Sequence, residues 1–186
     1  MTQDAASDLR PPTSDLRAQR LGPWVIPLVA AVILALDQIT KAWVLAALPQ
    51  NAAWVPIDAL SRFLTITHVT NTGAAFGLLK DRGIVFILIA IVVSVAIVLY
   101  SRHLPQGQVW VRFSLGLQLG GAVGNLIDRL RLGHVTDFIT VGIDNLKWPT
   151  FNVADSAIVV GVILLALILF TEKEEPRADP SNAQSA

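Results

Sequence analysis

Four long apolar segments constrain the fold of this chain more than any other feature of its sequence. They run over about residues 23–48, 83–100, 110–130 and 154–171. An α-helix needs about 20 mostly apolar residues to cross the hydrocarbon core of a bilayer, and each segment reaches or approaches that length. The sequence therefore predicts an α-helical polytopic membrane protein with four transmembrane helices.

Composition supports a membrane protein and excludes several kinds of chemistry. Only 15% of the 186 residues are charged and 53% are hydrophobic, whereas a soluble domain carries about 25% charged residues. The net charge is zero, which gives no reason to expect a nucleic-acid partner. The chain has no cysteine, so thiol catalysis, thiolate metal sites and disulfides are excluded.

The two ends of the chain are polar. Residues 1–22 contain a Pro-Pro pair and as many arginines as aspartates, and residues 172–186 are rich in charged residues, Pro and Ser. We expect both ends to be disordered tails on a membrane domain that covers residues 23–171. A cleaved signal peptide is the alternative for the N-terminus, but the following apolar stretch is too long and carries charges.

Two carboxylates, Asp137 and Asp155, follow the third segment and open the fourth. The sequence therefore places them near the same ends of two neighbouring helices. An acid at the centre of a membrane helix costs about 2.5–3.5 kcal/mol on insertion scales, so acids at such depth are functional candidates. Two carboxylates that share one proton can activate water beside a peptide bond. We place the chemistry at this pair.

A second interpretation of Asp155 is structural. Asn152 is suited to cap the fourth helix, and Asp155 stands three residues later, as in a capping box. Both interpretations can hold together. A helix N-terminus favours an ionised carboxylate, so we expect Asp155 to act as the base and Asp137 to carry the proton.

Other polar residues lie at the edges of the apolar segments. Asp37 and Lys41 stand four residues apart on one helix face, either as an interfacial ion pair with a snorkelling lysine or as a brace for the polar site. Asn125 and Arg129 have the same spacing. The partner of Arg129 is left open among the adjacent Asp128, Asp137 and a backbone carbonyl.

Glycines indicate how the helices pack. Gly116, Gly120 and Gly124 fall on one face of the third segment, where they allow another helix to approach closely. Ala157 and Gly161 form a second such seam. The segment 83–100 is apolar on every side except for one serine, and we assign it no chemistry.

The connections 49–82 and 131–153 are expected outside the membrane. Residues 62–70 and 138–148 alternate as strands do, which predicts a small β-sheet at the membrane surface. The apolar stretch 74–79 is a candidate short surface helix or lid. Asn71 is either a turn residue with positive φ or an amide that holds a substrate backbone. His68 alternates with apolar residues, so packing is favoured over metal ligation.

Five short blocks together resemble the bacterial lipoprotein signal peptidase (signal peptidase II) family over about residues 22–171. In the order of the family they are Asp37-Gln38-Ile39-Thr40-Lys41, Asn71-Thr72-Gly73-Ala74-Ala75-Phe76-Gly77, the glycine-rich run from Gly120 to Arg129, Val135-Thr136-Asp137-Phe138, and Phe151-Asn152-Val153-Ala154-Asp155-Ser156.

The resemblance implies an aspartic endopeptidase of the bacterial inner membrane with cytoplasmic termini and an active site near the outer face. It implies removal of the signal peptide from prolipoproteins, before a cysteine that carries a diacylglyceryl thioether. The substrate and membrane lipids are the partners, and we expect a monomer with no metal or other cofactor. The catalytic pair would be Asp137 and Asp155, and the substrate-binding and supporting residues would be Asn71, Gly73, Asn125, Asp128, Arg129, Asn152, Asp37 and Lys41.

Four other classes of protein are alternatives to an aspartic peptidase. A proton-coupled or cation transporter would spread its acids through the depth of the membrane, whereas here they gather at one end of the helices, without an inverted repeat. A metalloprotease would need a motif such as His-Glu-x-x-His, and the three histidines are scattered. A non-catalytic scaffold would tolerate Asp137→Asn and Asp155→Asn. A serine protease is disfavoured because no Gly-x-Ser-x-Gly motif occurs.

Overall fold

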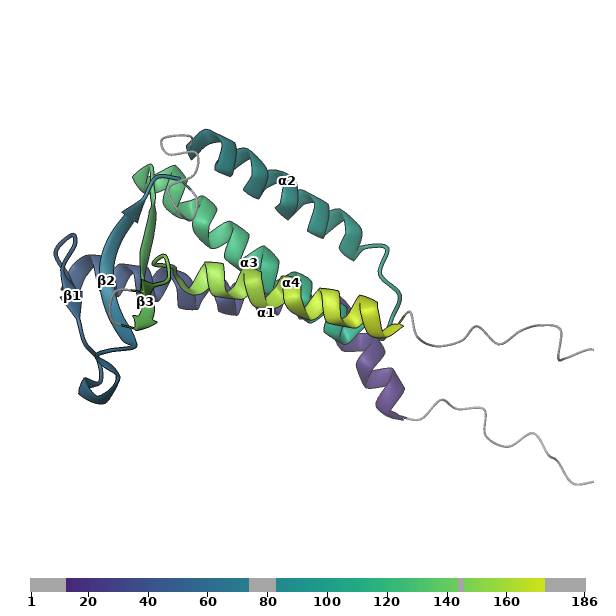
Figure 1. Cartoon of the computed structure of the whole chain (residues 1–186). Helices are drawn as coiled ribbons and strands as arrows, with labels where there is room; N and C mark the ends of the chain where they lie inside the picture. Colours follow the sequence, from purple (N-terminus) through teal and green to yellow (C-terminus); the bar gives the residue numbers. More distant parts are fainter. Residues whose placement is uncertain (1–12, 74–82, 144–145, 173–186) are drawn as a thin grey trace, which may run out of the picture.

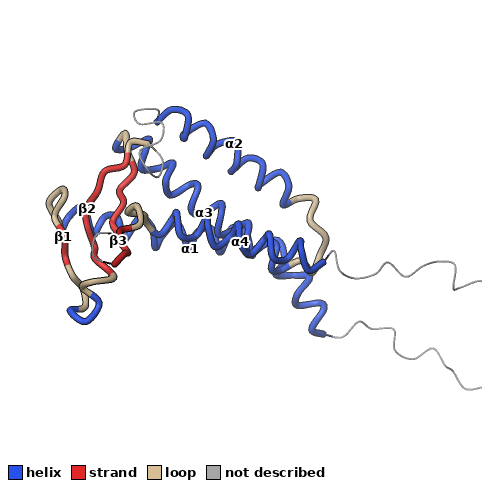
Figure 2. Tube along the Cα trace, in the orientation of Figure 1, coloured by secondary structure: helices blue, strands red, loops and turns tan. Residues whose placement is uncertain are grey.

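The computed structural model describes residues 13–73, 83–143 and 146–172. Its described part is a bundle of four α-helices with a small sheet at one end (Figures 1 and 2). The helices are α1 (Thr13–Ala47), α2 (Gly83–Ser101), α3 (Val109–Leu132) and α4 (Val153–Glu172). The strands are β1 (Ala53–Trp54), β2 (Leu64–Asn71), β3 (Val135–Ile143) and β4 (Leu146–Lys147), and a short 3-10 helix spans Asp58–Leu60.

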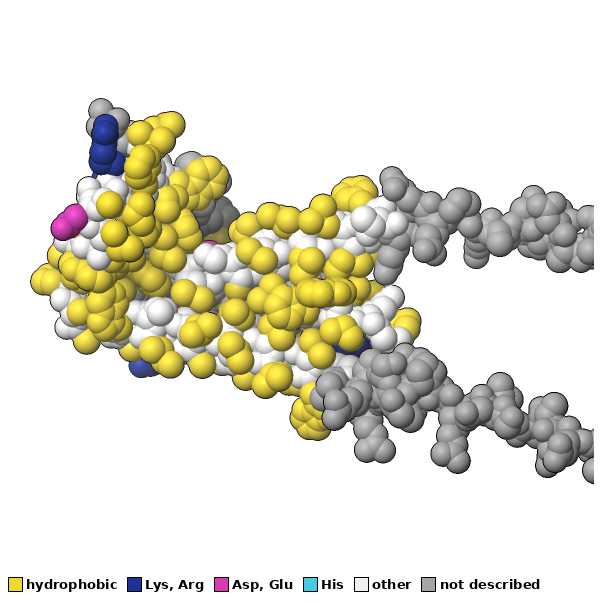
Figure 3. Space-filling model, turned by 90° about the horizontal axis from the view of Figure 1, so that it is seen from below, with side chains coloured by type: hydrophobic (Ala, Val, Ile, Leu, Met, Phe, Trp, Pro, Cys, Tyr) yellow, Lys and Arg dark blue, Asp and Glu magenta, His cyan; other side chains and the backbone are white. Residues whose placement is uncertain are grey.

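Three of the helices are long and apolar enough to cross a membrane, over Gly22–Ala47, Gly83–Ser101 and Val153–Thr171. Their outward side chains are hydrophobic, as the face drawn in Figure 3 shows. The helix α3 is 24 residues long, which corresponds to roughly 36 Å, but it carries more polar residues. By length and composition, the described residues therefore contain three candidate membrane spans.

The first helix begins earlier than the sequence predicts. Residues 13–22, which we expected to be disordered, form the first turns of α1, and the expectation is wrong for them. These residues include Leu, Ala, Arg and Gln, which favour helix, and they extend a helix that is already nucleated. Pro23 and Pro27 lie inside α1, and its first part is set at an angle to the rest (Figure 1).

The helix α3 lies at the centre of the bundle and packs against the other three helices. Its glycines explain this position, since a Cβ added at Gly116 or Gly120 would meet α1 within 3 Å. Gly121 faces α4, and Gly161 of α4 faces α3 in return. The predicted small-residue seams are therefore confirmed, and they allow α1 and α4 to approach α3 at backbone distance.

The sheet is antiparallel in the order β1-β2-β3-β4. Between β2 and β3 the register shifts, because two residues of β2, Thr67 and His68, oppose one residue of β3. Such a bulge redirects the neighbouring side chains. Here the backbone N–H groups of Phe138 and Ile139 donate instead to the carbonyl of Phe151 (3.0 and 2.8 Å), just before α4. The sheet is thus fastened to the start of α4.

The sheet end of the bundle collects the polar residues that the sequence singles out. The chain reaches this end where α1 ends, α2 begins, α3 ends and α4 begins (Figure 1). The beginning of α1 and the end of α4 lie together at the opposite end of the bundle. The stretch 74–79, our candidate lid, and the expected tails over 1–12 and 173–186 lie outside the described residues.

Candidate active site

Asp137 lies near the end of α3, as the sequence predicts, but it is carried by the strand that follows and not by the helix itself. The helix α3 ends at Leu132, and Gly133 follows with a left-handed φ of 77°. Glycine adopts this conformation without a Cβ penalty, which lets the chain turn back sharply. The strand β3 then starts at Val135, and Asp137 is its third residue.

The carboxylate of Asp137 is buried and held by two amides. The side chain is 2% exposed. Its Oδ1 accepts a hydrogen bond from Asn152 Nδ2 (2.7 Å), and its Oδ2 accepts one from Asn71 Nδ2 (2.9 Å). Burial, and then the nearby negative charge of Asp155, raise the pKa of Asp137 to about 7, although the two amides oppose the shift. A group with this pKa can carry a proton at neutral pH.

Asp155 closes the capping box predicted from the sequence. Asn152 Oδ1 accepts the backbone N–H of Asp155 (2.9 Å), and Asp155 Oδ2 accepts the backbone N–H of Asn152 (3.3 Å). The other carboxylate oxygen, Oδ1, accepts a hydrogen bond from Asn125 Nδ2 (2.7 Å). The structural interpretation of Asp155 is therefore confirmed, and both of its oxygens are held in fixed directions.

Both carboxylates line one cavity of about 630 Å³ at the junction of the sheet and the helices. Asn71, Gly73, Asn125 and Arg129 share its wall. The rest of the lining is mainly apolar and comes from α2, the start of β3, the chain before α4, and the first turns of α4: Phe86, Val135, Trp148, Pro149, Thr150, Phe151, Ser156, Ile158, Val159 and Val160. A concave apolar cavity with a few converging polar groups is the usual form of a binding site.

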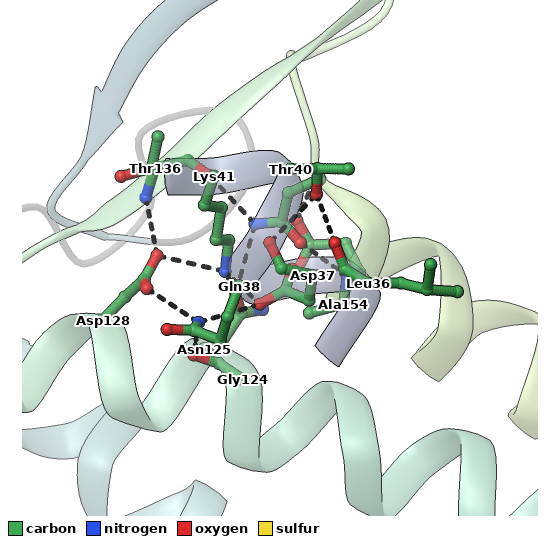
Figure 4. Close-up of polar contacts among 12 residues, drawn as sticks. Leu36, Asp37, Gln38, Thr40, Lys41, Gly124, Asn125, Asp128, Thr136 and Ala154 are labelled. Atoms are coloured by element: carbon green, nitrogen blue, oxygen red, sulfur yellow. Dashed lines mark hydrogen bonds and ion pairs between the residues drawn. The ribbon is translucent and has the colours of Figure 1, made fainter. Parts of the chain in front are cut away.

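Lys41 lies at the centre of a buried polar cluster beside this cavity (Figure 4). Its Nζ contacts Asp37 Oδ2 (2.9 Å) and Asp128 Oδ2 (3.0 Å), and it donates a hydrogen bond to Asn125 Oδ1 (2.9 Å). Lys41 is 2% exposed and Asp37 is fully buried. The bracing role of Asp37 and Lys41 is thus favoured over the interfacial ion pair, since a snorkelling lysine would be exposed.

The two acids of the cluster also hold the backbone beside the catalytic candidates. Asp37 Oδ1 accepts the backbone N–H of Ala154 (3.0 Å), which precedes Asp155. Asp128 Oδ2 accepts the backbone N–H of Thr136 (3.1 Å), the residue before Asp137. Asp37 and Asp128, from two different helices, thus fix the two segments that carry the candidate pair.

Arg129 hydrogen-bonds to a backbone carbonyl, one of the three partners left open for it. Its Nη1 donates to the carbonyl of Asn125 (3.3 Å), and its guanidinium lies over the ring of Phe86, 5.1 Å from the centroid. This is a cation–π distance. The segment 83–100, to which we assigned no chemistry, thus contributes by packing, because Phe86 of α2 supports Arg129 and lines the cavity.

Asn71 combines parts of both predicted interpretations. It ends β2, and its Oδ1 accepts the backbone N–H of Gly73 (3.0 Å), as in an Asx turn. Its φ is not positive, so that expectation is wrong, and its amide faces Asp137.

His68 packs as predicted, buried with Nδ1 2.9 Å from the carbonyl of Leu48. Among the described residues no group of three or more acidic or histidine side chains is arranged to hold a metal ion.

Two members of the site were not proposed from the sequence. Gln38 Nε2 contacts Asp37 Oδ2 and Asp128 Oδ1, both at 3.2 Å, and so links the two acids. Its position beside Asp37 in an apolar helix is the signal that could have identified it. Thr136 takes part through its backbone N–H, which no side-chain pattern reveals.

Comparisons with known proteins agree with this geometry. The family model described as signal peptidase (SPase) II matches residues 29–171. The lipoprotein signal peptidase of Moorella thermoacetica is 41% identical over 153 residues, which is 82% of this chain and 97% of that protein. The lipoprotein signal peptidase of Pseudomonas aeruginosa is 43% identical over 162 residues, 84% of this chain and 92% of its own length.

Solved structures show the same fold. A bacterial membrane enzyme determined at 2.3 Å resolution superposes with a TM-score of 0.75 and 32% sequence identity, over 82% of this chain and 91% of that one. A second bacterial membrane enzyme, at 1.9 Å, gives a TM-score of 0.67 and 34% identity. The five sequence blocks, the shared fold and the family match all agree, and the chain belongs to the signal peptidase II family of membrane peptidases.

Proposed function

We propose that this peptidase removes the signal peptide from diacylglyceryl-modified prolipoproteins, with water activated between Asp137 and Asp155. The observation that carries the proposal is that these two carboxylates, from β3 and α4, line the same cavity. The names of the relatives supply the class of substrate, since they are lipoprotein signal peptidases. The structure supplies the groups for the chemistry.

The two acids have different roles in this mechanism. Asp155, at a helix N-terminus, is the ionised base and takes a proton from the water as its oxygen attacks the scissile carbonyl carbon. Asp137 carries the proton and donates it to the carbonyl oxygen. When the C–N bond breaks, the proton on Asp155 passes to the leaving amine, and a hydroxyl of the tetrahedral intermediate returns a proton to Asp137 as the new carboxylic acid forms. The pair then has its starting protonation, and a new water enters between the two carboxyl groups.

The asparagines hold the acids rather than the substrate. The amides of Asn71 and Asn152 are directed at Asp137. Arg129 is half-buried and lines the cavity, and its Nη1 donates a hydrogen bond to the carbonyl of Asn125. Its other N–H groups are suited to bind a substrate carbonyl.

The arrangement in the membrane follows from the same site. We propose that α3 is a fourth span, because a helix shielded by α1, α2 and α4 can carry polar residues without exposing them to lipid. The sheet and the cavity then lie near the outer face of the inner membrane, both termini lie in the cytoplasm, and the domain covers residues 23–171. Ile158, Val159 and Val160 extend the cavity wall along α4, where acyl chains can lie.

Cleavage of a diacylglyceryl-modified precursor by purified protein tests the function. We expect kcat/KM for this substrate to exceed that for the same precursor without the lipid by about 100-fold or more, because burying acyl carbons contributes about 0.8 kcal/mol per CH₂. Mass spectrometry should place the cut immediately before the lipidated cysteine. Equal cleavage of both precursors, or a cut elsewhere, would contradict the proposal.

The pH dependence tests the proton on Asp137. Because burial raises its pKa to about 7, the protonated form is lost as pH rises through that value, and kcat/KM should fall above about pH 7. Asn71 donates to this carboxylate and lowers its pKa. In Asn71→Ala the alkaline limb should therefore move up by about one unit.

Gln50→Ala is the matched control for this profile. It removes an exposed amide whose Nε2 bonds Thr70 Oγ1 (3.0 Å), one residue before Asn71, and it should leave the limb in place. A limb that moves to lower pH in Asn71→Ala would show that Asp137 does not carry the proton.

A further inference from the structure

Three asparagine side-chain amides donate hydrogen bonds to the two carboxylates. Each amide oxygen faces a group that can only donate, and this contact fixes the orientation of the amide. An amide presents a carbonyl oxygen at one end and an NH₂ at the other, and a half-turn exchanges them. The backbone N–H of Gly73 faces Asn71 Oδ1 (3.0 Å), and that of Asp155 faces Asn152 Oδ1 (2.9 Å). Both of these amides must therefore direct their NH₂ groups elsewhere, and both reach Asp137.

The amide of Asn125 is fixed by a side chain instead. Lys41 Nζ, which has three donors and no acceptor, lies 2.9 Å from Asn125 Oδ1, and Asn125 Nδ2 lies 2.7 Å from Asp155 Oδ1. A half-turn of this amide would place NH₂ against the ammonium group and a carbonyl oxygen against the carboxylate. Both contacts are repulsive in a buried site.

A second donor to Asn125 cannot replace the lysine. Asn152 Nδ2 lies 3.1 Å from Asn125 Oδ1, but the same nitrogen lies closer to Asp137 Oδ1 (2.7 Å) and also near the carbonyl of Thr136 (3.4 Å). Its two hydrogens are therefore shared among three acceptors. Among the described residues, the ammonium group of Lys41 is therefore the stronger hydrogen-bond donor to Asn125 Oδ1.

We propose that Lys41 is a positioning residue that orients the Asn125 amide, and that this orientation keeps Asp155 the ionised member of the pair. The lysine acts through Asn125 and touches neither the substrate nor the water. This inference rests on the proposed function, since it assigns a base to the aspartate pair. In this inference a residue of α1, Lys41, influences the protonation of a residue of α4, Asp155.

The charges around Asp155 must be controlled in any test. Asp137 faces it from β3, Asp37 and Lys41 from α1, and Asp128 and Arg129 from α3, whereas α2 carries no acidic or basic residue. Removal of Lys41 alone changes the net charge and leaves two buried acids without their cation. Lys41→Met combined with Asp128→Asn removes one positive and one negative charge, so the net charge is unchanged.

The acidic limb of the kcat/KM–pH profile tests the role of Lys41, because this limb reports the protonation of the proposed base, Asp155. In the double variant the limb should lie about one pH unit higher than in the unmodified protein, which has the same net charge, since the ionised base loses an oriented donor. Asn125→Ala, which keeps the ion pairs of Lys41, should move the limb by a similar amount. Gln38→Ala weakens the same cluster without touching Asn125 and should leave the limb in place.

A second measurement separates this inference from the proposed function. Infrared spectra of ¹³C-aspartate-labelled protein without substrate follow the carboxyl C=O band, and the band lost in Asp155→Asn belongs to Asp155. The titration of this band should move in the same direction in the double variant as the acidic limb does. This readout does not require Asp155 to act in catalysis, so an active Asp155→Asn variant would refute only the proposed function. An unchanged titration in the double variant and in Asn125→Ala would refute the role of Lys41.

Discussion

Asp155→Asn and Asp137→Asn are each expected to lower kcat/KM for the lipidated precursor by about 10⁴-fold or more. Groups that act as one catalytic unit lose most of the rate acceleration when either is removed. Asparagine keeps the shape of the side chain but cannot accept a proton from water or donate one to the carbonyl oxygen. Each variant thus removes one half of the proposed proton transfer.

A loss of activity in these two variants is informative only if both proteins remain folded. Asp155→Asn keeps an oxygen that can accept from Asn125 Nδ2, and thermal unfolding in detergent should show a loss of about 1–2 kcal/mol at most. Asp58→Asn, in the exposed 3-10 helix, is the matched control and should retain full activity. Activity of either catalytic variant within 10-fold of the unmodified protein would contradict the assignment of that aspartate.

Gly121→Leu is expected to destabilise the bundle by about 3 kcal/mol or more, the upper part of the range for overpacking. A Cβ at Gly121 would overlap the backbone oxygen of Ala154 and approach Ile158 Cγ1 at 2.8 Å. The backbone of Ala154 cannot move aside cheaply, because its N–H is bonded to Asp37. Displacement of α4 would also shift Asp155, so activity should fall together with stability.

Ala96→Leu provides the control for added side-chain volume. Ala96 is exposed on the outer face of α2, where a larger apolar side chain meets only lipid or detergent. Unfolding followed by circular dichroism should show no loss of stability in this variant. Equal stability of Gly121→Leu and the unmodified protein would show that α3 and α4 do not pack at backbone distance.

Much of the fold could be predicted from local patterns. The helices and strands follow from hydrophobic runs and alternation, and the capping box of Asn152 and Asp155 follows from spacing alone. The extension of α1 through residues 13–22 was missed because polar residues next to two prolines do not resemble a membrane helix. Helix propensity and elongation prevailed there.

The geometry of the site depended on contacts that no local pattern encodes. The strand position of Asp137 depends on where Gly133 turns the chain after α3. The contact between Asp37 and the N–H of Ala154 joins residues 117 positions apart. Phe86 looked like any other apolar residue of α2, and its position under Arg129 arises from the packing of α2 on α3. Sequence reasoning therefore found the carboxylates and most of the polar residues around them, but not the contacts by which those residues orient the carboxylates.

A structure of the protein with a bound peptide analogue tests the central claim most directly. The analogue should carry a tetrahedral hydroxyl in place of the scissile carbonyl, since such groups mimic the transition state. We predict that this hydroxyl lies within hydrogen-bond distance, about 2.5–3.0 Å, of one oxygen of Asp137 and one oxygen of Asp155. A hydroxyl that contacts only one of the two carboxylates, or neither, would contradict the account.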